Sequence, residues 1–396
     1  MQSGFFARNR NTLSNVFDGQ PIALTAFASM QQSNDGASRF EQESNFWYLT
    51  GIEYPGWTLV IEKKSWLIAP NIEEVHHMFD GSLSWEDAQK ISGVDEIISF
   101  SEGEKLLNNL ANQHTTVMTL GNDPRAKHFD FTLNPAPAQL RRRLKKVFKK
   151  VKDCRFELAK LRAIKQPEEI EAIKQAINLT VQAFEVVKTN LKAYTYEYQI
   201  EADFTNMFRG SGATGHAYEP IIAGSKNACT LHYSKNQGSL SENDMILLDV
   251  GVRLNGYAAD ITRTYAKGTP TDRQKAVHAA VESAHKEVIS LLKPGLSVIE
   301  YQEKVDEIMK SKLKDLGLLK KPEDYRKYFP HAISHGLGVD VHDALGRPET
   351  FETGMVLTVE PGIYIPEEGI GVRIEDDILI TKTGHENLSA TLPTSL

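Results

Sequence analysis

Cysteine is scarce in this sequence, in which Cys154 and Cys229 are the only two among 396 residues. They form no C-x-x-C pair and no disulfide framework, which favours a reducing compartment and inert packing roles for both. No apolar run approaches the roughly 20 residues that a membrane-spanning helix needs. The first residues, MQSGFFARNRNTLSNVF, also lack the apolar core of a signal peptide. We therefore expect a cytoplasmic protein with no membrane partner.

Excess positive charge is missing as well, because 45 Lys and Arg residues face 52 Asp and Glu residues, for a net charge of −7. This balance argues against a nucleic-acid partner. No glycine-rich phosphate loop of Walker or Rossmann type occurs, and Ser334 does not lie in a G-x-S-x-G elbow. The composition, 41% hydrophobic and 24% charged, is that of a globular protein long enough for two or three domains.

Short strand-like and helix-like patterns alternate up to about residue 155. Residues 56–61 and 65–69 are predicted strands on either side of the polar turn 62–64, and residues 116–120 form a further strand. The basic run RRRLKKVFKKVKDCR at 141–155 fits either an anion-binding patch or the solvated face of a helix. The helix is favoured because apolar residues recur at helical spacing, at Leu144, Val147, Phe148 and Val151.

Two long helices are predicted after a boundary near residue 157. The first begins at Pro167, which suits a first helical turn, and its apolar face is Ile170, Ile173, Ile177, Val181 and Phe184. The second begins at Thr271 and ends before Pro294, and we interpret His278 and His285 beside its apolar stripe as packing residues.

A β-hairpin is predicted between residues 245 and 265, because Asn255-Gly256 is the strongest short hairpin signal. The two strands cover residues 245–253 and 257–265. Counting outwards from the turn places Asp249 opposite Thr262 and Asp260 opposite Gly251. Asp249 and Asp260 then become diagonal neighbours on one face, roughly 7 Å apart or less, and we expect the glycine to leave room for an ion.

Five residues with carboxylate or imidazole side chains stand in apolar or glycine-flanked contexts, namely LLDVG, AADIT, ISHGLG, LTVEPG and VRIEDD. A lone charge there would be costly, so such groups are normally paired or bound to a metal. Four carboxylates and one neutral imidazole suit two divalent cations that share oxygen ligands, with a hydroxide between them. The sequence therefore predicts a two-metal hydrolase with ligands at Asp249, Asp260, His335, Glu360 and Glu375.

Simpler interpretations exist for each part of this set. The two aspartates could lie on a solvated hairpin face, and Arg373 with Glu375 could form an ordinary structural ion pair. A single histidine is usually a packed polar residue, although three in the glycine-rich stretch 330–342 raise the odds of a site. One imidazole among carboxylates favours manganese, cobalt, zinc or iron over magnesium.

In order and context these residues resemble the pita-bread metallopeptidases, and within that family aminopeptidase P (Xaa-Pro aminopeptidase), with prolidase as a near relative. The matching motifs are LHYSKN at 231–236, LLDVGVRLNGYAADITRTY at 247–265, HAISHGLGVDVHD at 331–343, and VEPGIYI with GVRIEDD within 359–377. The N-terminal part resembles the family through Arg39-Phe40 and NFWYLTG at 45–51. The resemblance covers nearly the whole chain.

The resemblance implies a fold of α/β plus α+β class. Residues 1–156 would form an N-terminal, aminopeptidase P-like three-layer α/β domain. Residues 157–396 would form a pita-bread catalytic domain, in which helices flank a curved antiparallel sheet. The family's oligomers imply a homodimer or a tetramer.

The resemblance also implies individual roles. Asp249 would chelate one cation, His335 and Glu360 would bind the other, and Asp260 and Glu375 would bridge the two. The remaining matches to the family's site are His232, His331, His342, Tyr364 and Arg373.

The implied activity is hydrolysis of the peptide bond before proline, which releases the N-terminal residue, with two divalent cations as cofactors, manganese first and cobalt, zinc or iron as alternatives. Glu360 would orient the attacking hydroxide and take its proton, and His342 would stabilise the oxyanion together with a metal. His331 and Arg373 would hold the proline side or orient the ligands. The alternatives are a prolidase, which cleaves Xaa-Pro dipeptides, a non-catalytic pita-bread binding protein, and a creatinase-like hydrolase that needs no metal.

Overall fold

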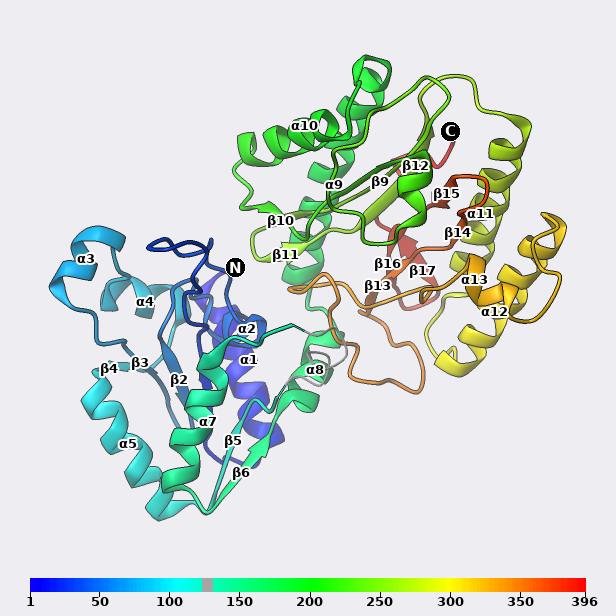
Figure 1. Cartoon of the computed structure of the whole chain (residues 1–396). Helices are drawn as coiled ribbons and strands as arrows, with labels where there is room; N and C mark the ends of the chain where they lie inside the picture. Colours follow the sequence, from blue (N-terminus) through cyan, green and yellow to red (C-terminus); the bar gives the residue numbers. More distant parts are fainter. Residues whose placement is uncertain (123–130) are drawn as a thin grey trace. The chain divides into compact units, whose positions relative to one another are not determined.

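The computed structural model describes residues 1–122 and 131–396, which divide into two compact units, Met1–Leu161 and Arg162–Leu396 (Figure 1). The boundary predicted after residue 156 lies inside α8 (Arg155–Ala163), which runs into the second unit. No helix among the described residues combines the length and the apolar character that crossing a membrane requires.

The first unit is built on one mixed sheet with strand order β4-β3-β2-β1-β5-β6. β1, β2 and β3 pair antiparallel, whereas β4, β5 and β6 join in parallel. β1 and β2 are buried at every position, so both faces of the sheet are covered. The strands are β1 (Ile22–Thr25), β2 (Thr58–Ile61), β3 (Ser65–Ile68), β4 (Glu96–Ile98), β5 (Thr116–Thr119) and β6 (Lys150–Asp153).

The helices of this unit form two groups. α5 and α7 pack on one face of the sheet through a core that includes Val60, Leu107 and Leu144, while α1, α2 and α4 contact one another (Figure 1). This arrangement is the predicted α/β layer domain, and the predicted strands at 56–61, 65–69 and 116–120 are confirmed. The helices are α1 (Ser3–Val16), α2 (Ser44–Thr50), α3 (Glu74–Asp80), α4 (Trp85–Ser92), α5 (Phe100–Gln113) and α7 (Pro135–Val147).

The helix predicted over the basic run 141–155 is wrong in its second half. α7 ends at Val147, and residues 150–153 form β6. Val151 pairs with Val117 of β5 and is flanked by exposed Lys150 and Lys152, a period of two that the helical spacing had masked.

The second unit contains four small antiparallel sheets, with orders β12-β9-β8, β11-β10-β7, β13-β16-β17 and β14-β15. An isolated bridge between Thr262 and Glu375 links the first of them to the chain between β15 and β16. The strands are β7 (Gly215–His216), β8 (Ile221–Gly224), β9 (Met245–Val250), β10 (Val252–Leu254), β11 (Tyr257–Ala258), β12 (Ile261–Ala266), β13 (Val356–Val359), β14 (Gly362–Ile365), β15 (Ile370–Arg373), β16 (Asp376–Ile380) and β17 (His385–Asn387).

Helices flank these strands, as the family resemblance implies (Figure 1). α9 and α10 pack together and against β10 and β8, whereas α11, α12 and α13 bury their apolar residues in one core with β13–β16. Two short 3-10 segments, η1 (Leu191–Ala193) and η2 (Ser225–Cys229), connect elements. The helices are α9 (Pro167–Asn190), α10 (Glu197–Gly210), α11 (Asp272–Leu291), α12 (Val298–Asp315) and α13 (Asp324–Tyr328).

The helix starts predicted at Pro167 and Thr271 are confirmed. Thr271 accepts a hydrogen bond from the amide of Gln274 at 3.2 Å, and its own amide donates to the Gln274 side chain at 2.8 Å, which forms a capping box. His278 and His285 are buried on α11, as expected of packing residues.

Candidate metal centre

The predicted hairpin register is confirmed. Asp249 lies opposite Thr262 and Leu254 lies opposite Tyr257, with one register on both sides of a break in each strand. The break separates β9 from β10 at Gly251 and β11 from β12 at residues 259–260. Asp260 therefore stands at an interruption of the ladder.

Gly251 serves a different purpose from the one predicted. A Cβ atom at this position would lie 1.7 Å from the carbonyl oxygen of Ala259. The space beside Gly251 is thus filled by the backbone of the opposite strand, and the prediction that it leaves room for an ion is wrong. The glycine lets the two strands approach closely at the break, which places Asp260.

Tyr218 joins the two hairpin aspartates. Its hydroxyl oxygen lies 2.6 Å from Oδ1 of Asp249 and 2.6 Å from Oδ1 of Asp260. Both carboxylates are buried, so a shared donor between them reduces the repulsion of two like charges. Sequence reasoning missed Tyr218, because the segment AYEP at 217–220 carries no spacing that signals a site.

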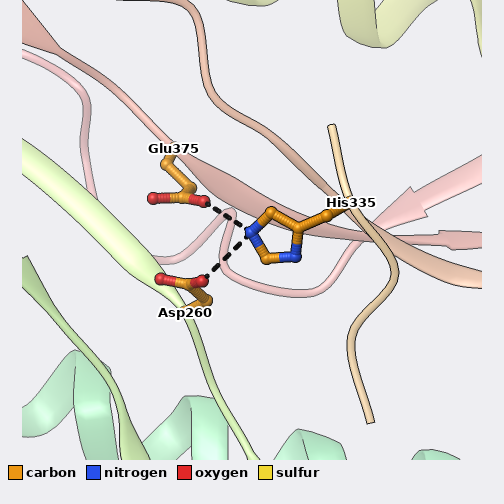
Figure 2. Close-up of side chains that lie close together, drawn as sticks. All are labelled: Asp260, His335 and Glu375. Atoms are coloured by element: carbon orange, nitrogen blue, oxygen red, sulfur yellow. Dashed lines mark ion pairs between the residues drawn. The ribbon is translucent and has the colours of Figure 1, made fainter. Parts of the chain in front are cut away.

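The carboxylates of Asp260 and Glu375 converge on the imidazole of His335 (Figure 2). Nε2 of His335 lies 3.4 Å from Oδ2 of Asp260 and 4.0 Å from Oε1 of Glu375, and ligand atoms of all three residues lie within 4.8 Å of one another. The other ring nitrogen, Nδ1, lies 3.0 Å from the carbonyl oxygen of Gly336. Only a protonated nitrogen can donate to a carbonyl, so in the neutral ring Nε2 keeps its lone pair for a cation.

Glu360 completes the set from the end of β13. Its Oε1 lies 3.6 Å from Nε2 of His335, and its Oε2 lies 3.4 Å from Nδ1 of His331. The amide of Glu360 donates to the carbonyl oxygen of Ile333 at 2.9 Å, which ties the end of this strand to the segment that carries both histidines.

Arg373 connects Asp249, the remaining predicted ligand, to the aromatic residues of the site. Its guanidinium donates to Oδ2 of Asp249 at 2.5 Å, to the hydroxyl of Tyr364 at 2.7 Å and to Oγ1 of Thr262 at 3.3 Å. The Tyr364 hydroxyl lies 2.9 Å from Nε2 of His331. Arg373 is only 4% exposed, so this cation offsets part of the buried negative charge.

Two more predicted residues lie at the rim. The ring of exposed His342 meets that of His335 edge to face, with centroids 4.3 Å apart. His232 is also exposed. Burial and the charge of Arg373 lower the pKa of His331 to about 4, and His232 contributes least to this lowering. The structure thus brings every predicted site residue to one region of the second unit.

Burial and mutual repulsion hold protons on this cluster when no cation is bound. Burial raises the pKa of Glu375 well above its ordinary value, and the charges of Asp260 and Glu360 add to the rise. Burial also raises the pKa of Glu360 to about 7, although the charges of His335 and Arg373 lower it. Burial alone would lower the pKa of His335, but its hydrogen bond to Asp260 and the surrounding carboxylates raise it to about 9. A divalent cation that binds must displace such protons.

These donors fit divalent cations. Carboxylate oxygens and one imidazole nitrogen with its lone pair free suit manganese, iron, cobalt and zinc. The ligand-orienting partners that such a site needs are also present, since Gly336 fixes the tautomer of His335 and Thr262 donates to Oε2 of Glu375 at 2.6 Å.

Known proteins are similar to this chain in sequence and in architecture. The model of metallopeptidase family M24 matches residues 171–382, and that of the aminopeptidase P N-terminal domain matches residues 6–118. The Xaa-Pro aminopeptidase of Escherichia coli (strain K12) is 32% identical over 98% of this chain and 94% of its own length.

Solved structures agree with this assignment. Aminopeptidase P from E. coli in a low-pH form aligns with a TM-score of 0.87 at 32% identity, covering 100% of this chain and 96% of that one. A zinc-substituted form of the E. coli enzyme in complex with product aligns with a TM-score of 0.84 at 31% identity over the same shares of the two chains. The fold, the converging donors and the matches over both units agree, and the chain belongs to metallopeptidase family M24, in the aminopeptidase P group.

Proposed function

We propose that this protein is a Xaa-Pro aminopeptidase that works with two divalent cations. Asp249 would chelate one cation, His335 and Glu360 the other, and Asp260 and Glu375 would bridge them. The observation that carries this proposal is the convergence of Asp260, Glu375 and Glu360 on Nε2 of His335. When bound, two such cations acidify a water molecule and polarise the carbonyl of the bond to be cleaved.

The protein's own groups supply proton transfer and positioning. Glu360 accepts the proton of the attacking water, because its carboxylate stands beside His335 at the proposed cation site. Its contact with His331 offers a path by which the proton can reach the leaving nitrogen. His342 stands over the His335 ring at the exposed rim, where its ring nitrogen can donate to the developing oxyanion.

Selectivity for proline follows from what the substrate lacks. The proline nitrogen in a peptide bond carries no hydrogen, so a site for it needs no hydrogen-bond acceptor there. The site needs instead a flat apolar surface that packs against the proline ring. His331 and Tyr364 pack edge to face, with ring centroids 5.5 Å apart, and Arg373 orients the Tyr364 hydroxyl. We propose that this aromatic pair lies beside the proline residue of the substrate.

Replacing Asp260 by Ala tests the two-cation proposal. Loss of a bridging ligand should abolish both bound metal, measured by atomic emission on purified protein, and hydrolysis of an Xaa-Pro-Xaa tripeptide. Asp272→Ala, which removes an exposed carboxylate of the same unit, is the control and should change neither. Normal turnover by the Asp260 variant would refute the assignment.

Substrate length and metal identity need separate assays. We propose manganese as the working metal, and reconstitution of the stripped enzyme with manganese, cobalt, zinc and iron tests this by comparing kcat/KM. Faster cleavage of an Xaa-Pro dipeptide than of the matching tripeptide would favour a prolidase. We also propose a cytoplasmic location, supported by two free thiols, and a homodimer or tetramer, which light scattering of the purified protein tests.

A further inference from the structure

Residues 230–238 carry His232, one of the residues that match the family's site, and have no regular secondary structure. No hydrogen bond to the His232 ring is found in the part of the chain that the structure describes, and the side chain is exposed. The position of this ring therefore depends on how firmly its neighbours in the segment are held.

Glu197, the first residue of α10, holds this segment with one buried carboxylate. Its Oε1 accepts hydrogen bonds from the amide of Gly224 at 2.8 Å and from Nδ2 of Asn227 at 2.8 Å. Its Oε2 accepts from the amide of Gly238 at 2.6 Å and from the hydroxyl of Tyr233 at 2.8 Å. All four donors come from residues 224–238, on both sides of His232.

The close fit at Gly238 shows that this contact is specific. A Cβ atom there would lie 2.7 Å from Oε1 of Glu197 and 2.7 Å from Nδ2 of Asn227. The backbone amide of Glu197 also donates to the carbonyl oxygen of Gly238 at 3.0 Å, so the glycine is held from both of its polar groups. A side chain at residue 238 would push the segment off the carboxylate.

The same segment packs against the catalytic side. Leu231 and Tyr233, the two neighbours of His232, contact an apolar cluster that contains Tyr364. The hydroxyl of Tyr364 in turn contacts Arg373 and His331. Fixing Tyr233 therefore fixes the distance between His232 and the aromatic pair proposed to meet the proline residue.

We propose that Glu197 is a positioning residue for peptide hydrolysis, which acts through Tyr233 and Gly238 to hold His232 at the substrate. The proposal rests on the proposed function and on the role given there to the aromatic side of the site. Glu197 makes no hydrogen bond to the proposed metal ligands, and four uncharged donors satisfy its carboxylate. Its contribution is therefore geometric, and a group of the same shape that accepts fewer hydrogen bonds should disturb it.

Glu197→Gln is the informative variant. The amide keeps the shape of the side chain, but its NH₂ group must face the backbone amide of either Gly238 or Gly224, which then has no acceptor. We expect normal metal content and a fall of about ten- to hundred-fold in kcat/KM for an Xaa-Pro-Xaa tripeptide, the usual size of an effect exerted through orientation. Tyr233→Phe removes one donor from the segment and leaves Glu197 in place. It should lower kcat/KM for the same tripeptide by a smaller factor.

A double-mutant cycle with His232→Ala separates positioning from general damage. If Glu197 acts through His232, the double variant should be no slower than His232→Ala alone. Asp203→Asn is the matched control, because Asp203 lies on the same helix and accepts a tyrosine hydroxyl, that of Tyr194 at 2.6 Å, but does not contact residues 224–238. Its effect, if any, should add fully to that of His232→Ala.

Amide hydrogen exchange gives a readout that does not require activity. Glu197→Gln should raise exchange in residues 230–238 and leave the strands of the metal centre unchanged, and Asp203→Asn should not. Unchanged exchange in this segment, full activity of Glu197→Gln, or additive losses in the cycle would each overturn the proposal. Failure of the wild-type protein to cleave any Xaa-Pro peptide would instead reject the proposed function, and exchange would still decide whether Glu197 anchors the segment.

Discussion

The metal-free protein should lose stability as the pH rises from 6.5 to 9, and His335 is the reason. Its pKa is about 9 in the folded protein and near 6.5 in an unfolded chain, because Asp260 and Glu360 favour the charged ring. Between these pH values the folded state binds the extra proton, so raising the pH favours unfolding. Full stabilisation is present below pH 6.5 and is gone above pH 9.

The size of this effect follows from the two pKa values. A rise from 6.5 to about 9 corresponds to roughly 3 kcal/mol at about 1.4 kcal/mol per pKa unit. For a unit of this size, each kcal/mol moves the unfolding temperature by about 2–4 °C, so a fall of roughly 6–12 °C is expected. Glu360, whose burial raises its pKa to about 7, adds to the loss only at the lower end of this window.

Three other histidines, His216, His285 and His331, do not contribute to the change in stability between pH 6.5 and 9. Burial lowers the pKa of His216, His285 and His331 to about 4, so the folded state binds fewer protons than the unfolded chain up to pH 6.5. Their contributions have the opposite sign and are complete before the window begins.

Differential scanning calorimetry of protein stripped with a chelator, at several pH values from 6.5 to 9, measures the slope. Saturation with manganese should flatten it, because a ring nitrogen that binds a cation holds no proton. His335→Gln should reduce it without metal and leave the part that Glu360 and Glu375, whose pKa values burial also raises, contribute with the same sign. A stripped wild-type protein whose unfolding temperature is constant across this range would refute the assignment of the proton to His335.

Three substitutions test the supports of the site. Arg373→Met breaks a buried ion pair with Asp249 and should cost about 3–5 kcal/mol of unfolding free energy in urea, less when cations neutralise Asp249; an equal loss with and without metal would contradict this. Gly251→Ala places a methyl group against the carbonyl oxygen of Ala259 and should lower both stability, by about 1–3 kcal/mol or more, and metal content, whereas unchanged values would show that the strands can separate there. Tyr218→Phe removes the donor shared by Asp249 and Asp260, and calorimetry should show a loss of about 1–3 kcal/mol in the metal-free protein that metal saturation reduces; a wild-type unfolding temperature would show that the hydroxyl is dispensable.

The hairpin shows how far sequence reasoning could reach. Asn255-Gly256 defines a two-residue turn, and counting from it places Asp249 opposite Thr262, as found, because side-chain alternation leaves few choices once the turn is known. The same reasoning could not foresee that the ladder breaks at Gly251. That break depends on the close approach of Ala259, a contact between backbones that side-chain patterns do not record.

The residues that sequence reasoning missed are those whose partners are distant or belong to the backbone. Tyr218 can be recognised as a site residue only from its contacts with Asp249 and Asp260, which lie 31 and 42 residues further along the chain. Glu197 looks like an ordinary acidic residue in the first turn of a helix, where it would suit the helix dipole. Its donors, two of them backbone amides, lie 27 to 41 residues further along the chain.

Arg263 explains why the ligands stay together without a contiguous motif. It is fully buried on β12, and its guanidinium donates to the carbonyl oxygens of Thr262 at 2.9 Å and Glu375 at 2.7 Å and to Oδ1 of Asp376 at 2.7 Å. One side chain thereby fixes the strand that follows Asp260 to the segment that supplies Glu375. Breaking the buried pair of Arg263 and Asp376 would leave an unpaired charge, which is costly. The pair therefore keeps these two segments together against the repulsion between the carboxylates, which a bound cation would neutralise. The proposed ligands can therefore be recognised from sequence motifs, whereas their spacing is set by buried polar groups that bond mainly to the backbone.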